Sequence, residues 1–147
     1  MIDKYLLKII CLCSLIVGAF LGIIPLIPAF IWIAFIGVMF FVAPFIIIYL
    51  KKLNLIKSIE TEKCLAIGAI SGTVAFLGFA IIYFPIAFIL NLIFKIQSFL
   101  WIKVIFFNIG FLLPMVILIA LLCGLLNMFS GFLTAYFYEY FNQKNRG

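Results

Sequence analysis

The chain has 147 residues, of which 69% are hydrophobic and 10% are charged. A soluble domain carries charge on roughly a quarter of its residues, so this composition excludes an ordinary water-soluble protein. The formal net charge of +6 arises from lysines and one arginine at the ends of apolar runs, with no basic patch, and nucleic acid is therefore not an expected partner. The sequence predicts an all-α integral membrane protein in contact with the lipid bilayer.

The first apolar run predicts a membrane span over about residues 5–24, because roughly twenty apolar residues cross the hydrocarbon core. The preceding lysines and the small residues Val17 and Ala19 also fit a cleavable signal peptide. Since the apolar run continues past Ala19 to Ile24, we expect the first helix to be retained.

The second span is predicted over about residues 28–50. Pro25 and Pro28 separate it from the first, because proline lacks the N–H that a continuing helix needs and suits the first turn of a new one. Lys51 and Lys52 follow it. Pro44 is expected to bend this span in its last third.

The longest uncharged run begins at Cys64 and predicts a third span over about residues 64–90. Beyond Pro85 we expect the helix to leave the hydrocarbon, with Asn91 and Lys95 meeting water. An interfacial segment is predicted over 91–108, between the third and fourth spans. A re-entrant hairpin after Lys95 is the alternative.

The fourth span is predicted over about residues 111–137, followed by aromatic residues and a basic tail typical of a helix leaving the bilayer. This order of spans divides the basic residues unequally between the two sides of the membrane. On the side of the termini and the 51–63 loop lie Lys4, Lys8, Lys51, Lys52, Lys57, Lys63, Lys144 and Arg146, whereas the other side has Lys95 and Lys103. By the positive-inside rule, both termini are predicted to be cytoplasmic, in a plasma or inner membrane.

Helices in lipid gain little from hydrophobic association, so their close packing depends on small residues that let two backbones approach. Such residues recur at helical spacing on the first, third and fourth spans. The candidate packing residues are Ser14, Gly18, Gly22, Gly68, Ser71, Gly72, Ala75, Gly78, Gly124 and Gly131. The second span offers mainly bulky residues, and we predict that it is the most lipid-exposed, with the other three spans forming the packed centre.

The sequence contains few chemically reactive side chains. There is no histidine, and the acidic residues Asp3, Glu60, Glu62 and Glu139 all lie outside the predicted spans. The cysteines show no paired spacing of the kind used by zinc or disulfide-exchange sites. We therefore expect no metal, no cofactor and no enzymatic activity, since nucleophile and base arrangements cannot be built from these residues.

Asn127, Ser130 and Thr134 share one face of the fourth span and are the candidate polar site. In one interpretation they line a pathway for an ion or small substrate at a subunit interface. The favoured interpretation is a hydrogen bond between helices, with serine and threonine also bonding to their own helix.

Two functional hypotheses remain. The first is a small polytopic inner-membrane protein that acts in interaction or assembly, or as an accessory subunit, within a homo-oligomer or a larger membrane complex. It rests on packing stripes without a chemical site. The alternative is an oligomeric channel or transporter subunit for an ion or small solute, because four short helices rarely enclose a pathway alone.

Overall fold

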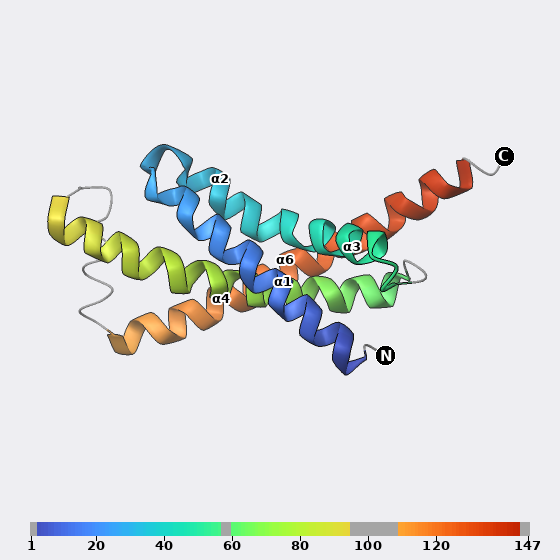
Figure 1. Cartoon of the computed structure of the whole chain (residues 1–147), viewed down its shortest axis with the longest axis horizontal. Helices are drawn as coiled ribbons and strands as arrows, with labels where there is room; N and C mark the ends of the chain where they lie inside the picture. The colour runs from blue at the N-terminus through green and yellow to red at the C-terminus, as the bar shows by residue number, and fades with distance from the viewer. Residues whose placement is uncertain (1–2, 57–59, 95–108, 145–147) are drawn as a thin grey trace.

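The computed structural model describes residues 3–56, 60–94 and 109–144 (Figure 1). Four of its helical stretches are long and apolar enough to cross a membrane, and the described residues contain no strand. The elements are α1 (Lys4–Ile23), η1 (Ile24–Leu26), η2 (Pro28–Phe30), α2 (Ile31–Ile36), η3 (Gly37–Phe41), α3 (Val42–Lys52), α4 (Thr61–Phe94) and α6 (Ile109–Lys144). The predicted all-α membrane fold with four spans is confirmed.

The third span is longer than expected. Helix α4 runs through Pro85 without interruption to Phe94, so residues 91–94 extend the span. The expectation that Asn91 meets water is wrong: only 4% of its surface is exposed. A polar residue near the end of an apolar run can be covered by neighbouring helices as well as by water, and its spacing does not distinguish the two. The rest of the predicted interfacial segment, 95–108, lies outside the described residues.

The second span is broken in a way that the sequence did not indicate. It consists of α2, a π-helical turn (η3) and α3, and Pro44 is the third residue of α3. Proline has no N–H for the carbonyl four residues earlier, and its ring crowds that carbonyl. A wider turn before the proline accommodates both effects, so the irregular backbone precedes Pro44, where the sequence predicted a bend at the proline itself.

Helix α3 ends in a Schellman motif. Asn54 has a φ of 56°, in the left-handed region that asparagine tolerates better than most residues. The Leu55 N–H donates to the Leu50 carbonyl at 3.0 Å and the Asn54 N–H to the Lys51 carbonyl at 3.0 Å. These bonds satisfy carbonyls that the last turn leaves without partners and reverse the chain toward α4.

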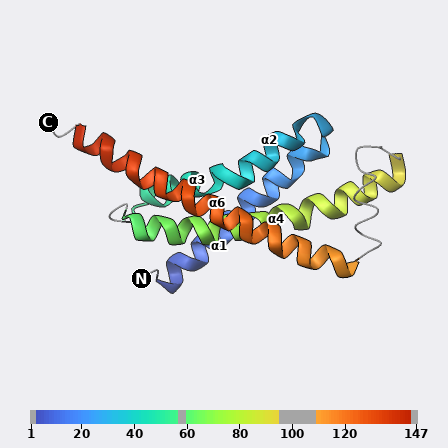
Figure 2. The ribbon, with the colours of Figure 1, turned by 180° about the vertical axis from the view of Figure 1, so that it is seen from behind.

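Helix α4 lies between α1 and α6. Figure 1 shows α1 crossing in front of α4 with α6 behind it, and Figure 2, from the opposite side, shows α6 in front. The second span packs against α4 and α6. One hydrophobic cluster combines Ala34 and Val38 with Phe76 and Phe79 of α4 and Cys123 of α6.

We predicted that the second span is the most lipid-exposed, and this prediction is wrong. Over the 18-residue apolar stretch of the second span, 33% of the residues are buried, against 22% over the corresponding stretch of the fourth span. Its buried side chains are Ala34, Val38, Val42, Ala43, Ile46, Ile47 and Leu50. Bulky side chains can pack without close backbone approach: the half-buried Phe35 lies on the buried Phe79 with ring centroids 5.3 Å apart. The small number of small residues in the second span therefore did not predict exposure.

Both ends of the chain lie at one end of the bundle, together with the end of α3 and the start of α4 (Figure 1). The η1 turn, the end of α4 and the start of α6 lie at the other. The Lys51 ammonium is 6.0 Å from the centre of the Tyr138 ring and connects the ends of α3 and α6. We call this the basic end, because Lys4, Lys8, Lys52 and Lys63 also belong to it.

Candidate functional site

Glycines bring α4 and α6 into backbone contact. A Cβ added at Gly72 would lie 2.5 Å from the Cys123 carbonyl oxygen, and one at Gly131 would lie 2.5 Å from the Cys64 carbonyl oxygen. Between these contacts, Gly68 faces the Asn127 carbonyl. Each pair steps four residues along α4 while stepping four back along α6, so the two antiparallel helices keep one register over this interface.

A second glycine contact joins α1 to α4. A Cβ at Gly18 would overlap the Ala75 backbone, and one at Gly22 would lie 2.8 Å from the Phe79 carbonyl oxygen. In the reverse direction, a Cβ at Gly78 would lie 2.5 Å from the Leu15 carbonyl oxygen. Real Cβ atoms do not approach other atoms so closely, so only glycine allows these helices to cross at this separation.

All ten candidate packing residues are buried. The structure divides the third-span set, which the sequence placed on one side of a single helix, between two neighbours. Ala75 and Gly78 contact α1, while Gly68 and Gly72 contact α6. The Ser71 hydroxyl donates to the Gly68 carbonyl of its own helix at 3.2 Å. Helix α4 is central because it carries two small-residue faces.

The polar site lies where α6 meets the break in the second span. A π-turn followed by a proline leaves backbone groups around Val38, Met39, Phe40 and Ala43 without their usual helical partners. In hydrocarbon there is no water to satisfy them, and each unsatisfied group costs several kcal/mol. The side chains of α6 supply the missing partners.

Asn127 forms hydrogen bonds with the backbone on both sides of this break. Its Oδ1 accepts the Ala43 N–H at 2.9 Å. Its Nδ2 donates to the Val38 carbonyl at 2.7 Å and to the Met39 carbonyl at 2.9 Å. The same nitrogen is 3.0 Å from the Cys123 carbonyl of its own helix, so its two hydrogens are shared among three acceptors. The side chain is fully buried, and its amide takes the place of a missing peptide group in the second span.

Ser130 completes the contact one turn later. Its hydroxyl donates to the Phe40 carbonyl at 2.6 Å. In a regular α-helix that carbonyl would accept the N–H of residue 44, which is Pro44 and has none. We call the contact of Asn127 and Ser130 with the second span the polar joint.

Thr134 does not belong to the polar joint. Its hydroxyl donates to the Ser130 carbonyl of its own helix at 2.8 Å. Two of the three residues predicted as a polar site are therefore brought together against the second span, and the third is not. The pathway interpretation stays a prediction.

The site offers structural hydrogen bonding and little chemistry. No group in the polar joint titrates near neutral pH. Among the described residues, no cluster of histidine, cysteine or acidic side chains could hold a metal ion. Cys64 and Cys123, which are buried, contact the glycines of the α4–α6 interface as small packing residues.

The backbone half of the polar joint was not predicted from the sequence. The signal was present in Pro44, which leaves the Phe40 carbonyl without its partner in a regular α-helix. A buried Asn and Ser three residues apart on another span are the groups able to satisfy such a break. Pairing these observations requires knowing which helices touch, and periodicity within one span does not provide that.

Comparison with protein-family models, with curated proteins and with solved structures finds no significant match.

Proposed function

We propose that the chain is a membrane-embedded assembly or accessory subunit of a plasma or inner membrane. The observation that carries this proposal is the closed polar joint. Asn127 and Ser130 are bonded to the backbone of the second span and Thr134 to its own helix. Asn127 and Ser130 hold α6 against the second span, and such bonds between helices are what a structural subunit in the bilayer requires.

Helix α6 is the surface on which a partner would assemble. It is the least buried of the spans, and in Figure 1 its C-terminal turns project beyond the other helices. Its outward side chains are apolar and include Leu118, Leu121, Leu122, Leu125 and Phe129. A transmembrane helix of a partner, or of a second copy, would pack there through van der Waals contact.

The proposed orientation places both termini in the cytoplasm, because basic residues gather at the basic end. A reporter fused to the C-terminus tests it. We expect a reporter that is active in the cytoplasm to be active, and one that needs export to be silent. Activity of the exported reporter alone would overturn the orientation.

The assembly proposal is tested by the oligomeric state in mild detergent and by crosslinking in the membrane. Cysteine pairs across the outward face of α6, beginning with Leu125→Cys, are expected to trap a dimer or a complex. The matched control is Ile33→Cys, which is 60% exposed on the second span. Equal crosslinking at both positions, or a strictly monomeric chain without partners, would contradict the proposal.

A second candidate is an oligomeric channel or transporter subunit for an ion or small solute. The observation that favours it is the π-turn beside Asn127, since π-turns and interrupted spans recur at functional sites of membrane proteins. Purified protein in liposomes would then conduct an ion or solute, and Asn127→Ala would abolish flux in folded protein. Absence of flux from a folded, reconstituted oligomer removes this candidate.

A further inference from the structure

Helix α1 and the second span separate as they approach the basic end. In Figure 1 they lie together near the η1 turn and diverge toward the end with both termini, and Figure 2 shows the same from behind. Two adjoining hollows lie between them, of about 190 Å³ and about 330 Å³, and both are lined by Val17 and Phe45.

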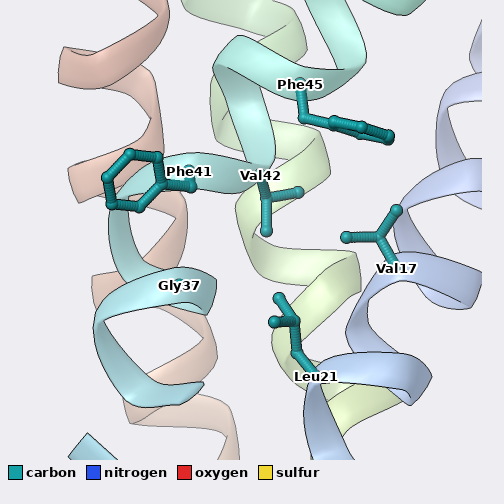
Figure 3. A pocket seen from close by; sticks show the side chains of 6 residues that line it. All are labelled: Val17, Leu21, Gly37, Phe41, Val42 and Phe45. Carbon is teal, nitrogen blue, oxygen red and sulfur yellow. The ribbon is translucent and has the colours of Figure 1, made fainter. Parts of the chain in front are cut away.

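We call these hollows the α1–α3 groove. Its lining from α1 is Cys13, Ile16, Val17, Phe20 and Leu21, and its lining from the second span is Gly37, Phe41, Val42, Phe45 and Tyr49. Figure 3 shows the smaller hollow, where Val17, Leu21 and Val42 point toward one another and the Phe45 ring extends toward α1. The only polar side-chain groups in this lining are the Cys13 thiol and the Tyr49 hydroxyl.

The break in the second span shapes this groove. Gly37 and Phe41 begin and end the π-turn, and both line the smaller hollow. At Gly37 a Cβ would come within 3.2 Å of the Leu21 side chain, so glycine keeps this end open. The backbone held by the polar joint on one side therefore forms the wall of the groove on the other.

We propose that the α1–α3 groove binds one acyl chain of an anionic phospholipid, with the headgroup at the basic end. The first reason is length. From Gly37 to Tyr49 the wall spans roughly 18 Å at 1.5 Å per residue. The hydrocarbon of one leaflet is roughly half of a 30 Å core. The groove therefore matches a single acyl chain from the leaflet at the basic end.

The second reason is charge. Phe45, Tyr49 and Lys52 follow one another at intervals of four and three residues along α3, so Lys52 lies on the groove side of the helix, one turn beyond Tyr49. Lys52 is exposed. A lysine just beyond an apolar groove places its ammonium at the level of lipid phosphates, where it attracts anionic headgroups.

The third reason is the character of the lining. Docking of a partner helix in lipid favours stripes of small residues, as in the α1–α4 and α4–α6 contacts. Apart from Cys13 and Gly37, the groove instead presents Phe, Tyr, Val, Leu and Ile side chains. Such a surface suits a flexible hydrocarbon chain better than a second helix.

The test measures which phospholipid stays bound. The full chain is reconstituted into nanodiscs with equal amounts of phosphatidylglycerol and phosphatidylcholine of the same acyl composition, extracted in mild detergent, and analysed by native mass spectrometry. We expect phosphatidylglycerol to be retained preferentially. Lys52→Gln should reduce that preference roughly fivefold, as expected for one lysine near an anionic headgroup.

Val17→Trp places an indole where the two hollows meet, and should lower total retained phospholipid at least roughly tenfold, because excluding even a few methylenes from an apolar site has that effect. The matched control is Leu118→Trp, at a position that is 62% exposed on α6, and should retain phospholipid as the unaltered chain does. Lys52 is exposed, so its variant stays informative even if Val17→Trp fails to fold.

Retention of the two phospholipids in the proportion supplied, or normal retention by folded Val17→Trp, would overturn the proposal. So would a different pattern, in which the unaltered chain is a lipid-free oligomer and Val17→Trp makes it monomeric. That result would show that a partner helix occupies the groove.

Discussion

Two kinds of contact hold this bundle together, the glycine contacts between helices and the polar joint, and they require different features of the sequence. The α1–α4 and α4–α6 contacts need only the absence of side chains, at Gly18, Gly72 and similar positions, so that backbones can meet. The polar joint needs particular atoms at particular places, because Asn127 and Ser130 must reach carbonyls exposed by a break in another helix. The first kind is a repeated pattern, and the second is a single fitted contact.

Asn127 is where the two kinds meet. Its carbonyl packs against Gly68 and its Cβ would lie 2.6 Å from a Cβ added at Gly72, while its amide bonds to the second span. The glycine contact with α4 therefore positions the residue that caps the break in the second span. Damage to the glycine contact is expected to propagate to the polar joint, whereas loss of the joint should leave the α4–α6 register intact.

Gly72→Leu is expected to have the largest effect. The new side chain would collide with the Cys123 carbonyl and the Asn127 Cβ, so α4 and α6 must separate. Overpacking of this kind costs about 3 kcal/mol or more when backbone stands in the way. Unfolding in mixed detergent micelles, followed by circular dichroism, measures the loss.

The matched control is Gly110→Leu, also in an apolar helix, because a Cβ at Gly110 has no neighbour within 4 Å. It should change stability by no more than about 0.5 kcal/mol. If Gly72→Leu were as stable as Gly110→Leu, the α4–α6 backbone contact would not exist.

Asn127→Ala should come next, at about 2–3 kcal/mol, because it leaves a buried N–H and buried carbonyls of the second span without partners. Leu125→Ala, at an exposed position of the same helix, is the control and should cost well under 1 kcal/mol. The α4–α6 register in this variant can be followed by a disulfide between two cysteines, one introduced on α4 and one on α6 where the two helices face each other. Loss of that crosslink in Asn127→Ala would show that the glycine contact depends on the joint.

The repeated contact was predictable from the sequence, whereas only the side-chain half of the polar joint, Asn127 and Ser130, was. Glycines at spacing of four in apolar helices indicate packing faces, and Gly18, Gly22, Gly68 and Gly72 were identified on that basis. The partners of each face depend on how the helices are arranged, so the division of the α4 residues between α1 and α6 was not predictable. The π-turn was not predictable for a related reason. Pro44 indicates that a carbonyl loses its N–H donor, but the replacement donor comes from α6 and depends on the tertiary arrangement of the helices.

Ser130→Ala should destabilise by about 1 kcal/mol, since it leaves the Phe40 carbonyl without a donor. The sharper measurement is a double-mutant cycle with Pro44→Ala, which restores an N–H at position 44. If the serine hydroxyl replaces that N–H, Ser130→Ala should cost less in the Pro44→Ala background. Additive effects would show that Ser130 and Pro44 act independently. The Ser130 hydroxyl would then not replace the N–H that Pro44 lacks.

Thr134→Val should have the smallest effect, within about 0.5 kcal/mol of zero, because the Thr134 hydroxyl donates only to the Ser130 carbonyl, which can also accept a bond within its own helix. Valine matches threonine in shape, so packing should be retained. The comparison with Ser130→Ala is informative because both residues lie on one face of α6 and both donate to a carbonyl. If the two substitutions lowered the free energy of unfolding equally, any hydroxyl on this face of α6 would stabilise the bundle to the same extent. If only Ser130→Ala is costly, the stability comes from the contact across helices, and the polar joint ends at Ser130.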